Sequence, residues 1–173
     1  MTMMRLLTIF FVLVLANSIT QACESASSSQ VQHVLKESIR LNDEFKKSVN
    51  GSDDKEYRRS RKRAENYEET KAIPCLKRAG TLLRRSSDLP LLETLFAHAY
   101  SHENSADETE SEVIASVFVE RPSPFLNLWK ASPVEVQRAV SLRTRTGWVQ
   151  IKEKFSISKR KQVELNLQSL LTK

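Results

Sequence analysis

Residues that could do catalytic or metal chemistry are few in this chain of 173 residues. His98 and His102 stand four positions apart, a spacing that places two imidazoles on one face of a helix. A catalytic zinc site needs a third protein ligand, and the sequence around the pair offers neither one nor a HExxH pattern. We therefore interpret the pair as ordinary surface or half-buried histidines and expect no metal and no other cofactor.

No residue is marked as a nucleophile either. Cys75 would need a neighbouring base and a group that orients this base, and the sequence indicates neither. No serine occupies a nucleophile elbow, and Gly51, Gly80 and Gly147 are too scattered to form a phosphate-binding loop. The chain is predicted to be a non-enzyme without a small-molecule substrate.

The densest charged feature is a short basic run, which consists of Arg58, Arg59, Ser60, Arg61, Lys62 and Arg63. Such a run can be a solvated charged face, a processing or trafficking signal, a nuclear import signal carried by its five basic residues, or a nucleic-acid patch. The nucleic-acid interpretation is the least favoured of the four. Only Tyr57 and Tyr67 lie nearby as aromatic side chains on which bases could stack.

The N-terminus predicts export. Arg5 precedes an apolar run from Leu6 to Ala16, and small residues precede Cys23, so residues 1–22 are predicted to be a secretory signal peptide. A membrane-spanning helix needs about 20 apolar residues, and neither this run nor a later one is long enough. The mature chain is expected to begin near Cys23. Cys23 and Cys75 are then the one pair that could form a disulfide, and the sequence leaves open whether they do.

Residues 23–73 are predicted to form a disordered leader. Apolar residues are scarce from Lys46 to Ala72, so this stretch buries too little surface to offset its chain entropy. One short amphipathic helix is expected before it, with Val31 and Leu35 on the apolar face. Asn50 begins a sequon for N-glycosylation.

Residues 74–173 are predicted to form a small all-α bundle, because apolar residues recur there at helical spacing. Ser132 is the expected N-cap of one helix, with Pro133 as its first residue and Glu135 completing a capping box. Trp129 is expected to be a core anchor. Helices are expected over 75–85 with a break at Gly80, over 89–100, 110–119 and 125–129, after Ser132, after Gly147, and around 163–171.

The order of these segments resembles the secreted RXLR effectors of oomycete plant pathogens. That family carries Arg-x-Leu-Arg and then a Glu-Glu-Arg element in its leader. Here Arg58-Arg59-Ser60-Arg61 and Glu68-Glu69-Thr70 stand in the corresponding places, with Ser60 instead of Leu and Thr70 instead of Arg. From Leu128 to Val136 the chain resembles the Trp-x-x-x-Ser-Pro-x-x-Val run of the family's WY helical core.

The resemblance implies a WY-like helical protein that enters plant host cells and binds host proteins to suppress immunity or cell death. The basic run predicts that the protein accumulates in the host nucleus, with the host cytoplasm as the alternative. Two other functions stay open. The chain could be a secreted peptide precursor cut at dibasic pairs such as Lys77-Arg78 and Arg84-Arg85, or a basic protein that binds nucleic acid or a membrane surface.

Overall fold

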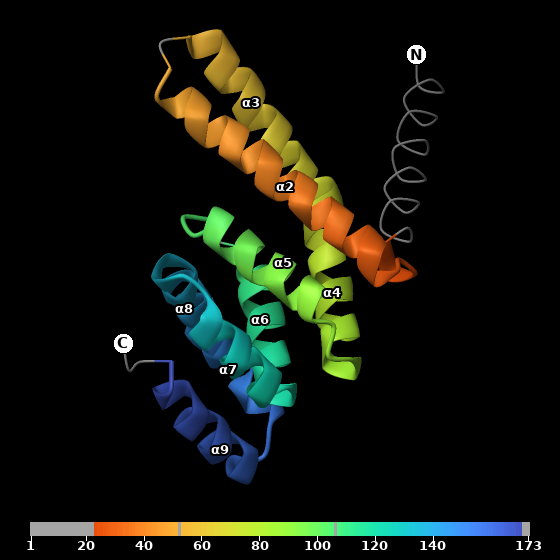
Figure 1. Ribbon diagram of the computed structural model, residues 1–173, viewed down its shortest axis with the longest axis vertical. Coiled ribbons are helices and arrows are strands. Elements are labelled where there is room, and N and C mark those ends of the chain that lie inside the picture. The colour runs from red at the N-terminus through yellow and green to blue at the C-terminus, as the bar shows by residue number, and fades with distance from the viewer. Residues whose placement is uncertain (1–22, 52, 106, 171–173) are drawn as a thin grey trace, which may run out of the picture.

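The computed structural model describes residues 23–51, 53–105 and 107–170, and every regular element in these ranges is a helix. The prediction of an all-α fold is confirmed (Figure 1). The predicted signal peptide, residues 1–22, lies outside the described residues. Within the described ranges, no helix combines the length and the apolar character needed to cross a membrane.

A long helical hairpin forms one end of the molecule (Figure 1). Its two arms are α2, Ser28–Val49, and α3, Asp54–Tyr67, which lie side by side. The π-helix η1, Glu68–Ala72, and then α4, Ile73–Arg85, follow α3 directly. The chain therefore has no break at the predicted boundary between residues 73 and 74.

The remaining helices form the body of the molecule, in which α6 and α8 make the most extensive helix pair and α2 lies across α5. Apolar side chains from α2, α4, α5, α6, α7 and α8 join in a single core. The elements are α5, Leu89–Ser101; α6, Glu108–Glu120; α7, Pro122–Ala131; α8, Val134–Ile151; the 3-10 helix η2, Lys152–Lys154; and α9, Ile157–Gln168.

The prediction of a disordered leader is wrong for the described part of residues 23–73. Helix α2 begins with a capping box, in which Ser27 and Gln30 satisfy each other's backbone N–H groups. Val31 and Leu35 are fully buried in the core. The expected short amphipathic helix is real, but it is longer than predicted and belongs to the folded body.

Helix α3 explains why the sequence looked disordered there. None of its 14 described residues is buried. Its first N–H groups are capped by the Asp53 carboxylate, and an ion pair between Arg61 and Glu65 spans one turn. These local interactions are individually weak. The helix therefore depends on its packing against α2 and on its continuation into η1 and α4.

A disulfide joins Cys23 to Cys75 and ties the start of the hairpin to α4. Both cysteines are buried. The question that the sequence left open is thus answered. The bond closes a loop with a sequence separation of 52, which contains the whole hairpin. Cross-links of this kind restrict the unfolded chain more than the folded one.

Replacing Cys23 and Cys75 together by serine should lower the free energy of unfolding by roughly 4 kcal/mol, the chain-entropy value for a loop of this size. Thermal melts with and without a reductant measure this. Reduction should bring the wild-type melting temperature down to that of the double variant and leave the variant unchanged. A reduced wild-type protein that melts like the oxidised one would contradict the prediction.

The expected helix breaks at glycines do not occur. Helix α4 passes through Gly80, and α8 runs without interruption through Gly147. A β-carbon at Gly147 would lie 1.9 Å from the carbonyl oxygen of Ser111 and 2.9 Å from the β-carbon of Ala115. Gly147 is therefore needed for close approach of α8 to the backbone of α6, and not for a turn.

The start of α8 also differs from the prediction, whereas the role of Trp129 is confirmed. The N-cap is Pro133, without a side-chain cap, and the Ser132 hydroxyl donates to the carbonyl of Leu128 instead. Trp129 is buried, and its indole N–H donates to the carbonyl of Gln137 at 3.0 Å. The tryptophan thus fixes α7 against the first turn of α8.

Gly147→Ala should destabilise the protein by at least about 2 kcal/mol, because backbone atoms of α6 would have to move away from the new methyl group. Gly51→Ala is the matched control, since a β-carbon there would meet its nearest neighbour at 3.4 Å, an ordinary contact. Urea unfolding of both variants tests the difference. Equal midpoints for the two variants would show that α6 and α8 can separate at little cost.

Candidate functional site

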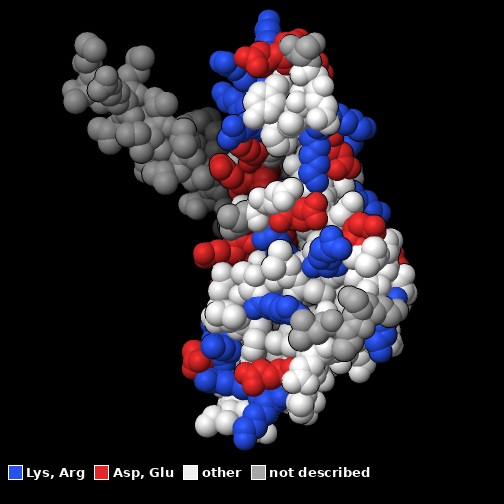
Figure 2. Space-filling model, turned by 90° about the vertical axis from the view of Figure 1, so that its left-hand side faces the viewer, with Lys and Arg blue, Asp and Glu red and all other residues white. Residues whose placement is uncertain are grey.

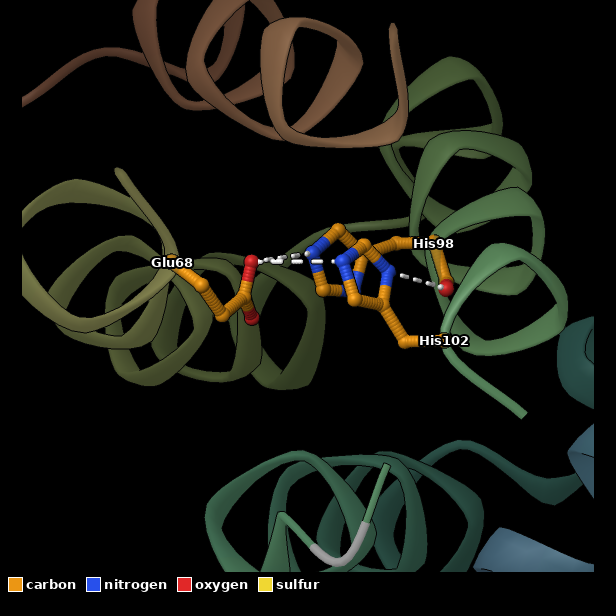
Figure 3. Close-up of side chains that lie close together, drawn as sticks. All are labelled: Glu68, His98 and His102. Carbon is orange, nitrogen blue, oxygen red and sulfur yellow. Dashed lines mark hydrogen bonds and ion pairs between the residues drawn. The ribbon is translucent and has the colours of Figure 1, made fainter. Parts of the chain in front are cut away.

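Five ionisable side chains meet where η1 faces α5, and Figure 3 shows three of them. Glu68 comes from η1, His98 from the C-terminal half of α5 and His102 from the C-cap of α5, whereas Glu110 belongs to α6 and Arg143 to α8. We refer to these five residues as the buried ionic cluster. No other feature of the described chain brings this many titratable groups together in the interior.

The π-helical turn η1 positions Glu68. The N–H of Ile73 donates to the carbonyl of Glu68, five residues back, which is the spacing of a π-helix. Pro74 comes next and has no N–H to donate, so an ordinary α-helical bond could not form at that position. The extra residue of the π turn changes the direction in which the side chains point, and Glu68 faces the two histidines of α5 (Figure 3).

His98 and Glu110 form the centre of the cluster. Their side chains are 0% and 1% exposed, and Nδ1 of His98 lies 2.6 Å from Oε1 of Glu110. The other carboxylate oxygen of Glu110 lies 3.2 Å from Nε of Arg143. A buried carboxylate needs such compensation, because an unpaired charge in the interior is strongly unfavourable.

Arg143 also closes the connection between α5 and α6. One of its terminal nitrogens donates to the carbonyls of His102 at 2.6 Å and Ser105 at 2.8 Å. The other donates to the carbonyl of Asp107 at 3.3 Å. A single guanidinium therefore pairs with a buried carboxylate and also satisfies the carbonyls of a turn that leads from one helix to the next.

Glu68 faces both imidazoles with one oxygen. Its Oε2 atom lies 3.5 Å from Nε2 of His98 and 3.4 Å from Nε2 of His102. The two rings are stacked, with centroids 4.1 Å apart. The hydroxyl of Ser38, from α2, donates to the same Oε2 atom. Glu68 therefore links the hairpin to α5 through polar contacts.

The cluster shifts the pKa of its members. Burial acts to lower the pKa of His98, but the hydrogen bond to Glu110 and the negative charges of Glu110 and Glu68 raise it to about 9. Burial acts to raise the pKa of Glu68, and the charges of the two histidines together with the Ser38 hydroxyl hold it below its usual value. Burial and the charge of His98 both lower the pKa of His102. With His98 protonated, the positive charges of His98 and Arg143 balance the negative charges of Glu68 and Glu110.

The interpretation as surface or half-buried residues is wrong for His98 and holds for His102, which is half-buried. His98 is fully buried, and the side chain of His102 is 10% exposed. The third potential metal ligand that the sequence seemed to lack is Glu68, which lies 30 residues upstream of His98. No local spacing connects Glu68 with the histidines, and its place in the Glu-Glu-Arg-like element suggested another role.

The other residues of the Arg-x-Leu-Arg-like and Glu-Glu-Arg-like motifs do not lie together in the structure. Arg58, Arg59 and Arg61 are exposed on α3, whereas the Ser60 hydroxyl turns toward α2 and lies 2.6 Å from that of Ser48. Glu69 is exposed, and the Thr70 hydroxyl donates to the carbonyl of Asn66 within its own helix. Glu68 alone among them reaches the interior.

The residues predicted for nuclear import all lie on the exposed surface of α3, and they are Arg58, Arg59, Arg61, Lys62 and Arg63. Basic side chains alternate with acidic ones over the hairpin end of the molecule (Figure 2). Asn50, the predicted glycosylation site, is exposed at the C-cap of α2. Its position leaves room for a glycan on the surface.

A cleft of about 620 Å³ lies beside the buried ionic cluster. It separates the hairpin from the end of α5, and Glu68 and His102 contribute to its wall together with Phe45 and Asp107. Burial raises the pKa of Asp107. The cleft gives small solutes access to one side of the cluster, while His98 stays out of contact with solvent.

Comparison with known proteins gives no match, since no family model, no curated protein and no solved structure matches this chain. The resemblance to RXLR effectors therefore depends on the sequence motifs and on the order of the segments.

Arg143→Met should destabilise the protein by about 3–5 kcal/mol, because the substitution removes one of the two cationic partners of the buried Glu110 carboxylate and all the bonds of Arg143 to the α5–α6 turn. Arg58→Met is the control, since Arg58 pairs with Asp54 on the surface and exposed pairs contribute little. The double variant Arg143→Met, Glu110→Gln should recover part of the loss. Urea unfolding checks all three proteins, and similar midpoints for the two single variants would contradict the expectation.

Proposed function

We propose that this chain is an exported, non-enzymatic effector that enters plant host cells and binds host proteins there to suppress immunity or cell death. The single observation that carries the protein-binding part is an exposed face of α8. We call it the α8 stripe, and it consists of Val134, Arg138, Leu142, Arg145 and Val149.

The α8 stripe has the spacing of one helix face. Its members follow one another at three or four residues, so they lie over four turns of the helix on the same side. Leu142 is 58% exposed and Val149 is 64% exposed. The opposite side of α8 carries Val140 and Trp148, which are buried in the core. Large apolar side chains in solvent at regular spacing are typical of a helix that contacts a partner.

The chemistry of the stripe indicates what kind of partner fits it. Arg138 and Arg145 alternate with the apolar side chains, and arginine is enriched at protein interfaces. A host protein with an apolar groove flanked by carboxylates would match both features. The two guanidinium groups would pair with the carboxylates, and Leu142 and Val149 would enter the groove.

Other features support export and the place of action. The Cys23–Cys75 disulfide is the kind of bond that forms in oxidising compartments, and its burial protects it from thiols after entry into a host cell. The exposed basic run on α3 supports accumulation in the host nucleus. The dibasic pairs Lys77-Arg78 and Arg84-Arg85 lie within helix α4, which argues against a peptide precursor because proteases cut loops more readily than helices.

Leu142→Glu should abolish function while the fold is kept. Residues 23–173 are expressed in plant leaves as wild type, as Leu142→Glu and as Leu165→Glu, a control on α9 with the same 58% exposure. Capture by proximity labelling and suppression of triggered cell death are both measured. The proposal expects the same host proteins and the same suppression for wild type and Leu165→Glu, and loss of both for Leu142→Glu.

Loss of suppression in both variants, or in neither, would overturn the assignment of binding to the α8 stripe. Melting temperatures of the three purified proteins serve as the folding control, because a glutamate in solvent should leave them nearly equal. Absence of suppression by the wild type would overturn the effector function itself. Intact mass of the secreted product separates this function from a precursor, which would yield several short peptides.

A further inference from the structure

We propose that Glu68, His98 and His102 form a binding site for one Zn²⁺ ion. The ligand atoms would be Nε2 of each histidine and a carboxylate oxygen of Glu68, and in the structure these atoms all lie within 4.8 Å of one another. The site is separate from the α8 stripe. The proposal therefore stands or falls independently of the proposed function.

The hydrogen bonds at Nδ1 of the two rings turn both Nε2 atoms toward Glu68, where Nε2 of His102 also lies 3.4 Å from the Ser38 hydroxyl. Nδ1 of His102 lies 3.1 Å from the carbonyl oxygen of His98, which can only accept, so this nitrogen carries the hydrogen. Nδ1 of His98 bonds the Glu110 carboxylate at 2.6 Å and carries the hydrogen as well. In its neutral form each ring then presents the lone pair of Nε2, as metal-bound histidines do, and the entering ion would displace the proton that His98 carries there at neutral pH.

Both Nε2 atoms face the Glu68 carboxylate (Figure 3), and one of the stacked rings would tilt so that both lone pairs meet a single ion. They lie 3.5 Å and 3.4 Å from Oε2 of Glu68. Ligand atoms at the corners of a tetrahedron with bonds of about 2.0–2.1 Å are about 3.3 Å apart. Nε2 of His98 is buried and has no hydrogen-bond partner among the described residues. A buried nitrogen without a hydrogen bond, close to a carboxylate and a second imidazole, is typical of a metal ligand in a protein without its ion.

The groups behind the ligands have the arrangement found around metal centres. Glu110 accepts from His98 and is itself paired with Arg143, so a carboxylate fixes the orientation of the imidazole. The Ser38 hydroxyl donates to Glu68. These contacts come from α2, α6 and α8, outside the elements that supply the ligands. The ligands are therefore held in place by rigid helices.

The donor set selects the ion. Two imidazoles and one carboxylate suit zinc, whereas Mg²⁺ and Ca²⁺ prefer sites made of oxygen atoms. The cleft beside the cluster provides the entry path, because Glu68 and His102 line it. The fourth position of the ion would face this cleft and hold a water molecule. Since Glu68 belongs to η1 and the histidines to α5, the ion would clamp the hairpin onto the body.

The test is zinc titration of the secreted, chelator-treated protein. Calorimetry should show one Zn²⁺ per chain and the melting temperature should rise with zinc, because a ligand of the folded state stabilises it. Mg²⁺ at the same concentration should do neither. Cobalt(II) in place of zinc should give the strong visible absorption of a tetrahedral complex.

Variants connect the binding to these residues. Glu68→Gln and His102→Gln should each weaken zinc binding at least tenfold, and Glu110→Gln, which acts through His98, by about 10–100-fold. His33→Gln is the matched control, since His33 is exposed on α2 and its loss should change nothing. His98 is left intact because substitution of a fully buried side chain could prevent folding.

Three outcomes would overturn the proposal. The first is no zinc binding by the wild type. The second is binding that survives in Glu68→Gln and His102→Gln, which would show an adventitious ion only. The third is an equal loss in His33→Gln. Circular dichroism of each variant before titration confirms that the helices are present, so that a loss of zinc binding reports on the site.

Discussion

The buried bond between His98 and Glu110 is the interaction on which the rest of the structure depends. A carboxylate at 1% exposure requires compensation from more than one side. His98 supplies it from α5 and Arg143 supplies it from α8. Once these three side chains are in place, α5, α6 and α8 have fixed positions relative to one another. Glu68 then adds the hairpin to the same network through η1.

This constraint explains how a hairpin with little core of its own stays attached. Helix α3 contributes no buried side chain, so its packing against α2 is too shallow to hold the hairpin to the body. Three connections at the base of the hairpin do this. The Cys23–Cys75 disulfide closes the loop that contains the hairpin, α2 buries its apolar stripe against the body, and the π turn directs Glu68 into the cluster. Each acts at the base of the hairpin, which leaves its tip and the basic run in solvent.

The sequence predicted what local patterns encode. Helices in residues 74–173 and the burial of Trp129 follow from apolar spacing, which depends on neighbours within a few turns. The buried ionic cluster could not be predicted from apolar spacing, because Glu68, His98 and Arg143 lie far apart in the chain and the residues next to them show no pattern that connects them. Gly147 was taken as a helix break because its partner, the backbone of Ser111, is 36 residues away. The second arm of the hairpin was missed because apolar residues are scarce from Lys46 to Ala72, whereas the first arm, α2, is anchored by buried apolar side chains such as Val31, Leu35 and Leu41.

Helix α8 connects the interior network with the surface that we propose for recognition. When positions are projected at 100° per residue, Arg143 lies on nearly the opposite side of the helix from Val134 and Arg145 of the α8 stripe. Its guanidinium holds the carbonyls of His102 and Ser105, and this prevents α8 from rotating about its axis. The close approach at Gly147 prevents it from sliding along α6. With rotation and translation both fixed, the exposed stripe is rigid before a partner arrives, and a rigid surface loses less conformational entropy on binding than a mobile one.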